Sequence, residues 1–380
     1  MRVFFNAIFV QILLSTYVLW RGWNALPKNN FIRIPFVTLF IAELIIYMIG
    51  YFGSRHLPFD ILHYFAWVGT TWMLLIIYMS FLLMVYDVAR FIDKRKKFLP
   101  AKVELWRSRY RLPYFIISLV VVAGSLFWGN YQFYHPTVTQ MDLSIDKPSK
   151  IKELKVVVAS DLHVGILINK SVLSMYVDSI MAQKPDVILL VGDLIDYDIR
   201  SVKMHNMQEE FKRLKAPYGV FASTGNHDYI ELPDEYYGEK IDWLGRENGL
   251  TMLRDTAVLV DSSFYLVGRE DDKCKNRKEL PRIMQGVDKS FPIIVMNHEP
   301  HRLHEEVDAG ADLAVYGHTH NGQFFPVNLI LKFMYELPFG YKKTDNTHQY
   351  VSSGLGLAGP QYRIGTISEI VVLNLKFRQD

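Results

Sequence analysis

The sequence predicts an α/β domain of two packed sheets flanked by helices, preceded by an all-α domain that crosses a membrane four times. Long apolar segments fill the first 130 residues, whereas short β-branched runs alternate with helical stretches after residue 150. Charge separates the same two parts, with net +9 over residues 1–150 and net −6 over residues 151–380. We therefore expect a transmembrane domain over 1–130, a polar connector over 131–150 and an α/β domain over 151–380.

The four apolar segments cover about residues 3–20, 35–52, 64–86 and 112–128. Each approaches the ~20 residues that cross the hydrocarbon core of a bilayer. The first segment resembles a signal peptide, but Asn6 and Gln11 interrupt it and three more spans follow, so we expect it to be retained. Glu43 lies within the second span, where an interhelical hydrogen bond is favoured over a functional role.

Loop charges predict the orientation of these spans. Twelve Lys and Arg residues lie in the loops after the first and third spans, nine of them within residues 90–111, against two on the opposite side. Because positive loops stay in the cytoplasm, the chain after residue 128 is expected outside it, in a multi-pass protein of the cell (inner) membrane. One span fewer would reverse this orientation. Contact of the basic loop 90–111 with anionic lipid headgroups is a second reading of its charge.

Five apolar runs predict the buried strands of the α/β domain. Each run has four or five residues, too short for a helix and apolar throughout, as in strands covered on both faces. These strands are expected over residues 156–159, 187–191, 219–222, 293–296 and 313–316. Helices are expected over 171–183 and 209–215, and further strands within 251–268, 349–353 and 370–377.

A short polar block follows each of these runs. The blocks are Asp161-Leu162-His163, Gly192-Asp193, Gly225-Asn226-His227-Asp228, Asn297-His298 and Gly317-His318-Thr319-His320. Each block alone is commonly a turn, but five in order after buried strands indicate a site, because strand carboxyl ends converge on one edge of a sheet. Asp, Asn and His side chains suit two adjacent borderline-hard cations and hydrolysis at phosphorus.

Composition excludes some other kinds of site. Cys274 is the only cysteine, so the chain has neither an intrachain disulfide framework nor a thiolate metal cluster. The acidic second part is also a poor partner for nucleic acid, whose binding depends on neutralising phosphates. We therefore expect no nucleic acid among the partners, and two metal cations as the cofactors.

The ordered blocks resemble the calcineurin-like metallophosphoesterase superfamily over about residues 151–380. The local sequences of residues 160–165, 317–323 and 350–356 resemble those of a bacterial membrane-associated branch of this superfamily, which includes UDP-2,3-diacylglucosamine pyrophosphatase-like enzymes. The resemblance implies a four-layer β-sandwich flanked by helices. It also implies a metal-dependent phosphoric ester hydrolase that binds two divalent metal ions. Manganese is the expected metal, and iron, zinc or nickel are the alternatives.

The resemblance also implies a role for each site residue. Asp161, His163 and His320 would bind the first metal, Asn226, His298 and His318 would bind the second, and Asp193 would bridge both. His227 would not bind metal but would lie beside the phosphorus as a catalytic residue, with Asp228 orienting its imidazole. Asp196 is either such a supporting residue or part of a turn. Asn321 departs from the glycine that is common at its position in this branch.

An apolar segment, residues 324–341, follows the last predicted ligands directly and ends at Lys342-Lys343. One reading places it in the core. The other rests it on the bilayer, where it would guide a lipid tail to the metals.

We therefore expect a membrane-anchored phosphoesterase that hydrolyses a phosphoester or pyrophosphate of a lipid or lipid-linked substrate through a hydroxide between two metals. Soluble substrates are the alternative. A noncatalytic scaffold and a transporter with an accessory hydrolase are disfavoured, because the predicted ligands are complete and the spans carry little beyond Glu43. The sequence gives neither the exact ester type nor the oligomeric state.

Overall fold

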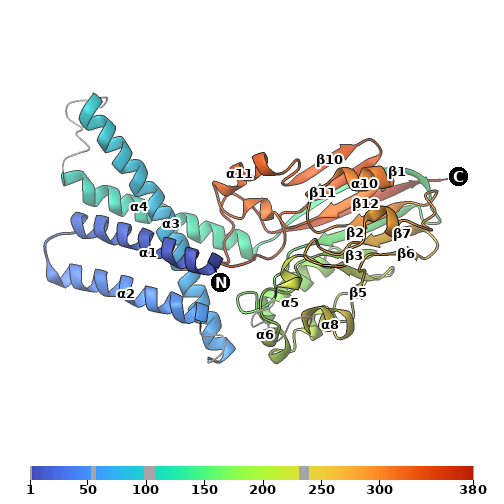
Figure 1. Cartoon of the computed structure of the whole chain (residues 1–380), viewed down its shortest axis with the longest axis horizontal. Helices are drawn as coiled ribbons and strands as arrows, with labels where there is room; N and C mark the ends of the chain where they lie inside the picture. The colour runs from blue at the N-terminus through green and yellow to red at the C-terminus, as the bar shows by residue number, and fades with distance from the viewer. Residues whose placement is uncertain (1, 53–56, 98–107, 231–238, 380) are drawn as a thin grey trace. The chain divides into compact units, whose positions relative to one another are not determined.

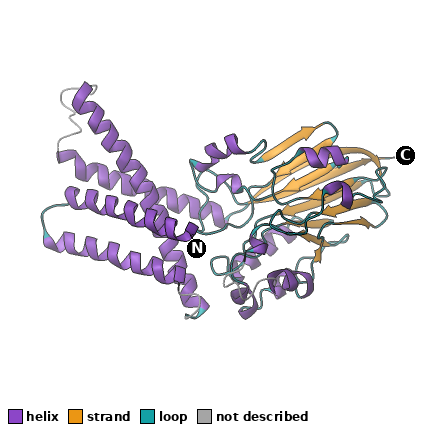
Figure 2. Cartoon of the chain, in the orientation of Figure 1, coloured by secondary structure: helices purple, strands orange, loops and turns teal. Residues whose placement is uncertain are grey.

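The computed structural model describes residues 2–52, 57–97, 108–230 and 239–379. The chain divides into two compact units, Met1–Gly129 with Gly359–Gln361, and Asn130–Ala358 with Tyr362–Asp380. The first unit is helical and the second combines sheets with helices, as Figure 2 shows by colour. Part of the predicted basic loop, residues 98–107, lies outside the described residues.

Among the described residues, four long helices make up most of the first unit (Figure 1). They are α1 (Arg2–Ala25), α2 (Asn30–Phe52), α3 (Phe59–Lys96) and α4 (Arg111–Tyr134). Among the described residues, three segments are long and apolar enough to cross a membrane: Asn30–Gly50, Phe59–Lys96 and Ser108–Tyr134. Helix α1 covers the first predicted span but is not one of these three, so the fourth crossing stays a prediction.

Helix α3 is longer than the predicted third span. Its 38 residues extend about 57 Å at 1.5 Å per residue, well beyond a hydrocarbon core of about 30 Å. The basic residues Lys94, Arg95 and Lys96 therefore form its last turn instead of a loop.

Polar contacts join α1 to α3 inside the first unit. Asp87 of α3 accepts a hydrogen bond from the Tyr17 hydroxyl at 2.7 Å and pairs with the Arg21 guanidinium at 2.9 Å. The buried Oε2 of Glu43 has no hydrogen-bond partner among the described residues, which gives no support to the interhelical hydrogen bond predicted for this side chain.

Two six-stranded sheets form the second unit. The first sheet has the order β1 (Thr137–Pro148), β12 (Glu369–Arg378), β2 (Glu153–Ala159), β3 (Val187–Val191), β4 (Val220–Ser223) and β5 (Thr251–Met252). The second has the order β10 (Gly340–Thr344), β11 (Thr347–Val351), β9 (Leu313–Tyr316), β8 (Ile293–Met296), β7 (Phe264–Gly268) and β6 (Thr256–Val260). The five predicted buried strands are confirmed as β2, β3, β4, β8 and β9.

The predicted connector contains a strand of the first sheet. β1 pairs in parallel with β12, from Thr137 opposite Glu369 to Pro148 opposite Arg378. Its alternate residues Leu143 and Ile145 are buried between the sheets, whereas the residues beside them are more exposed. The prediction of a connector over 131–150 is therefore wrong, since an edge strand with one polar face resembles a loop in composition.

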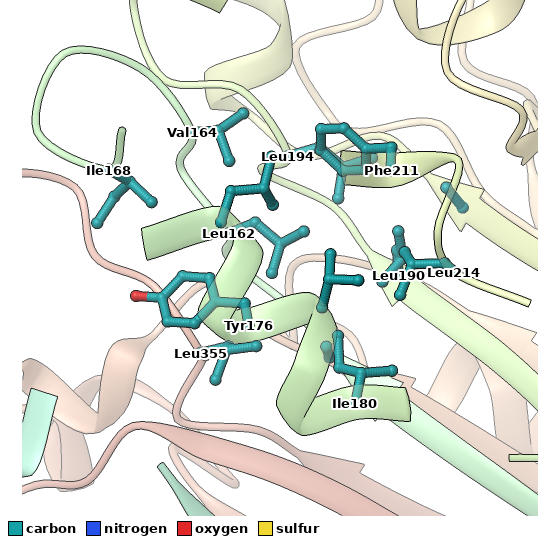
Figure 3. Packing of buried hydrophobic residues seen from close by; sticks show 14 of the residues in the cluster. Leu162, Val164, Ile168, Tyr176, Ile180, Leu190, Leu194, Phe211, Leu214 and Leu355 are labelled. Carbon is teal, nitrogen blue, oxygen red and sulfur yellow. The ribbon is translucent and has the colours of Figure 1, made fainter. Parts of the chain in front are cut away.

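Strand alternation builds the layers of this unit. On β2, Val156 and Val158 face the second sheet, whereas Val157 and Ala159 belong to a cluster shared with helices. The helices of this cluster include α5 (Lys170–Met181), α6 (Ile199–Met204), α7 (Gln208–Phe211) and α8 (Glu239–Arg246), together with Phe133 near the end of α4. Figure 3 shows part of it, including Tyr176 and Leu190. The second sheet is covered by α9 (Leu280–Ile283) and α10 (His304–Ala309), which confirms a four-layer sandwich flanked by helices.

Candidate metal centre

Seven side chains predicted as metal ligands lie at the carboxyl ends of strands in both sheets. Asp161 and His163 follow β2, Asp193 follows β3 and Asn226 follows β4 in the first sheet. His298 follows β8, and His318 and His320 follow β9 in the second. Because the two sheets pack face to face over a shared apolar cluster, these ends lie along one edge of the sandwich.

One group of donors joins Asp161, His163 and His320, whose candidate ligand atoms lie within 4.8 Å of one another. The Nε2 atoms of His163 and His320 face each other at 3.2 Å, and His320 Nε2 lies 3.6 Å from Asp161 Oδ1. Two imidazole nitrogens and a carboxylate aimed at one point fit a metal ion.

A second group joins Asp193, His298 and His318 within the same limit. His318 Nδ1 lies 2.8 Å from the Asn226 amide oxygen, so Asn226 belongs to this group as well. His298 Nε2 is buried and lies 3.2 Å from Asp193 Oδ2, but it has no hydrogen-bond partner in the part of the chain that the structure describes. Since a buried imidazole nitrogen normally has a partner, this atom fits a metal ligand.

Asp193 lies between the two groups. Its Oδ2 is 3.2 Å from His298 Nε2 on one side and 3.6 Å from His163 Nε2 on the other. One carboxylate oxygen therefore reaches donors of both groups, as a bridging ligand must.

The backbone around these residues is unusual. Five of the seven have positive φ, between 48° and 72°, a region that non-glycine residues rarely adopt: Asp161, His163, Asp193, His318 and His320. Strained backbone of this kind persists where the surrounding structure imposes it, commonly at functional sites. Gly192 makes room beside them, because a Cβ there would collide with the His298 ring.

Burial and charge set the protonation of these groups. Burial alone would raise the pKa of Asp193, but the neighbouring His298, with His163 and His227, holds it well below its usual range. Burial lowers the pKa of His318 to about 4 and, with the nearby His163 charge, lowers the pKa of His320 well below its usual range. These two imidazoles are therefore neutral at pH 7, the form that binds metal.

His227 lies beside the donors and is held by Asp196. Its Nδ1 is 2.9 Å from Asp196 Oδ1, and its backbone N–H donates to Asp193 Oδ1 at 2.7 Å. Burial would lower the pKa of His227, but the hydrogen bond to Asp196 and the charge of Asp193 raise it. This contact favours the reading of Asp196 as a carboxylate that supports His227 over its reading as a turn residue.

Asp228 has a different role from the one predicted. Its carboxylate accepts backbone N–H groups of Leu194 and Ile195 at 3.1 Å and of Gly225 at 2.9 Å. It therefore ties the loop after β3 to the loop after β4. The prediction that Asp228 orients His227 is wrong, because the imidazole nitrogen faces Asp196 instead.

Sequence reasoning missed several residues around the centre. Two buried cations, Arg363 and Lys240, donate to backbone carbonyls of site residues, among them those of His320 and His227. Glu299 and His301 pair at 3.0 Å, and together with His318 they form an outer group of potential donors. The only sequence signal for Glu299 and His301 was their closeness to His298.

Comparisons with known proteins agree with this geometry. A family model described as calcineurin-like phosphoesterase matches residues 154–322. An uncharacterized metallophosphoesterase of Campylobacter jejuni is 32% identical over 272 residues, covering 69% of this chain and 70% of that protein. One from Helicobacter pylori is 30% identical, covering 73% of each chain.

A transmembrane protein with metallophosphoesterase domain from Danio rerio is 27% identical over 278 residues, covering 69% of this chain and 62% of that protein. The narrower resemblance to UDP-2,3-diacylglucosamine pyrophosphatase-like enzymes is not tested by these relatives and stays a prediction. The ordered motifs, the gathered donors and these similarities show that the chain belongs to the calcineurin-like phosphoesterase family of metal-dependent phosphoester hydrolases.

Proposed function

We propose that this chain is a membrane-anchored phosphoesterase with two metal ions that acts on a lipid or lipid-linked phosphoester or pyrophosphate. Two divalent ions in such a centre supply Lewis-acid polarisation of the phosphoryl group and activation of water. The single observation that carries the chemistry is the position of Asp193 Oδ2 between the two groups of imidazole nitrogens.

The chain's own residues divide the work. The first ion would be held by Asp161, His163 and His320, the second by Asn226, His298 and His318, and both by Asp193. Sites with Asp and His donors accept several divalent metals according to availability, and our proposal is manganese, with iron, zinc or nickel as alternatives. The low pKa values of His318 and His320 keep both imidazoles neutral, so that each has one unprotonated ring nitrogen available to bind metal.

His227 is placed to donate a proton or hydrogen bond to the substrate. Asp196 occupies Nδ1, which leaves Nε2 for the phosphoryl or leaving-group oxygen. The raised pKa of His227 favours the protonated form that such a donor requires. Asp228 supports this arrangement indirectly, since it fixes the backbone on both sides of the centre.

An exposed apolar helix supports a lipid substrate. Helix α11 (Val327–Met334) begins five residues after the 3-10 turn His320–Gly322, and only Leu331 in it is buried. Phe333 is 92% exposed, Met334 67% and Ile330 52%. This overturns the core reading of residues 324–341 for the helix itself, and it favours contact with acyl chains.

A paired substrate assay tests the lipid proposal. The double variant Ile330→Ser and Phe333→Ser should lower hydrolysis of a lipid phosphoester in mixed micelles at least ~10-fold, since each buried apolar side chain contributes about 1.5–3 kcal/mol. Hydrolysis of a small soluble aryl phosphoester should change little. Met204→Ser, at an apolar side chain that is 64% exposed on α6, is the matched control. Equal losses on both substrates would favour soluble substrates instead.

The extracytoplasmic placement of the catalytic domain in the inner membrane is also a proposal. It is supported by the loop charges but depends on the fourth crossing, which α1 would supply. In the double variant Met204→Cys and Cys274→Ser, the cysteine at position 204 should react with a membrane-impermeant thiol reagent on intact cells. Labelling only after lysis would place the domain in the cytoplasm and point to three spans.

A further inference from the structure

Arg363 is a fully buried cation beside the candidate metal centre. Its Nη1 donates to the Ser353 carbonyl at 2.7 Å and the His320 carbonyl at 3.2 Å. Its Nη2 donates to the Gly354 and Gly356 carbonyls at 2.6 and 2.7 Å. The hydrogen bonds that this guanidinium makes thus go to four backbone oxygens instead of a carboxylate.

The loop that Arg363 holds lies directly against Asp161. Leu355 and Gly356 donate their backbone N–H groups to the carbonyls of Ser160 and Asp161, both at 2.9 Å. At Gly354 a Cβ would crowd the Asp161 Cβ at 2.9 Å and His320 Nδ1 at 3.1 Å. The loop therefore supports the Asp161 backbone and packs against both Asp161 and His320.

The charge of Arg363 is costly where it lies. Burial lowers the pKa of its guanidinium to about 10, while Tyr176, Asp161 and Glu369 oppose that shift, so the group stays protonated at pH 7. A buried charge is kept only where hydrogen bonds and nearby opposite charge offset the loss of water. Here that compensation comes from the four backbone carbonyls and from nearby Tyr176, Asp161 and Glu369, and it includes two predicted ligands of the first metal, the His320 carbonyl and the Asp161 carboxylate.

We propose that Arg363 is the positioning residue of the first metal site. It fixes Asp161 and His320 in their positive-φ conformations by holding the loop 353–356 and the His320 carbonyl together. This inference rests on the proposed two-metal function, which assigns these two residues to the first metal. It adds that affinity for that metal depends on a cation outside the ligand set.

The effect should be selective for one half of the centre. None of the four carbonyls that Arg363 holds belongs to Asn226, His298 or His318. His298 is oriented from elsewhere, with its Nδ1 2.9 Å from the Val191 carbonyl oxygen. Losing Arg363 should therefore weaken the first metal and leave the second largely unchanged.

Manganese binding to the full-length chain in detergent tests this inference without any substrate. The wild type and the variants Arg363→Lys and Arg363→Met are titrated with Mn²⁺ after chelation, and two dissociation constants are fitted. We expect one of the two affinities to fall about 10- to 100-fold in Arg363→Met, the usual effect of losing a residue that supports a metal ligand. Arg363→Lys, which keeps the charge, should restore part of the loss.

Lys240→Met is the matched control. Lys240 is also fully buried and donates to backbone carbonyls, those of Asp196 at 2.7 Å, Ile230 at 2.6 Å and His227, none of which belongs to a predicted metal ligand. It should keep both manganese affinities within about threefold of the wild type.

Equal affinities in the Arg363 variants and the wild type would overturn the inference, as would an equal loss of both metals. If Arg363→Met does not fold, the manganese affinities of Arg363→Lys decide the question. Lysine keeps the positive charge but lacks the two Nη donors with which the guanidinium binds the loop carbonyls. A wild-type chain that binds fewer than two ions would overturn the proposed two-metal function, and the inference with it.

Discussion

Asp196 and Asp228 both lie near His227, but replacing each by asparagine should change a different property, the rate of hydrolysis for Asp196 and the stability of the fold for Asp228. Asp196 Oδ1 lies 2.9 Å from His227 Nδ1, whereas Asp228 accepts backbone N–H groups of Leu194, Ile195 and Gly225. Asp196→Asn keeps the shape of the side chain but removes its charge. Asp228→Asn leaves an amide NH₂ facing backbone donors.

The size of each effect follows from the bond that is lost. A hydrogen bond to a charged group contributes about 1.5–3 kcal/mol, which is about 10- to 150-fold in rate if His227 acts in the transition state. Asp196→Asn should lower kcat/KM by that factor with little loss of stability. Asp228→Asn should lower the free energy of unfolding by about 1–3 kcal/mol, because it strands a buried backbone donor.

The pH dependence separates the two roles further. Burial alone would lower the pKa of His227, but the hydrogen bond to Asp196, followed by the charge of Asp193, raises it above its usual value. Activity that needs protonated His227 is present below its pKa and is lost as pH rises through it. Asp196→Asn removes a raising influence, so the falling limb of log kcat/KM should move to lower pH.

The assay is a pH profile of hydrolysis of a soluble phosphoester, with urea unfolding of each variant alongside. A shifted limb in Asp228→Asn, with an unshifted one in Asp196→Asn, would refute the assignment of Asp196 to the imidazole.

Two further predictions concern the fold around the centre. Gly192→Ala should impair metal binding and lower Tm, because the added Cβ would collide with the His298 ring and because position 192 has a φ of +71°, which alanine rarely adopts. Unchanged manganese content and an unchanged Tm would contradict this prediction. Leu143→Ala should destabilise the chain by about 2–4 kcal/mol in urea unfolding, because β1 belongs to the sheet. A decrease in the free energy of unfolding of less than about 0.5 kcal/mol would indicate that residues 137–148 act as a connector and not as a strand of the sheet.

The buried strands were predictable because each is apolar on both faces and ends at a polar block. β3, β8 and β9 lie over the predicted residues without change. β1 was not predictable, since it buries only alternate residues such as Leu143 and its partner β12 is more than 200 residues away along the chain. Local composition carries no information about such a distant pairing.

The site was predictable to the extent that its residues follow strand ends. Asp161, Asp193 and His298 lie near one another as expected, although their metal roles still await measurement. The choice between Asp196 and Asp228 as the partner of His227 depended on loop conformation, which sequence spacing does not specify. The burial of Arg363 was equally hidden, because an isolated arginine in a sequence is expected at the surface.

The most direct test of the two-metal account is electron paramagnetic resonance of the manganese-loaded full-length chain. Two ions joined by Asp193 at about 3.5–4 Å should give an exchange-coupled dinuclear spectrum, and Asp193→Asn should abolish both the coupling and hydrolysis. An active wild-type chain that shows only isolated manganese ions would contradict the account.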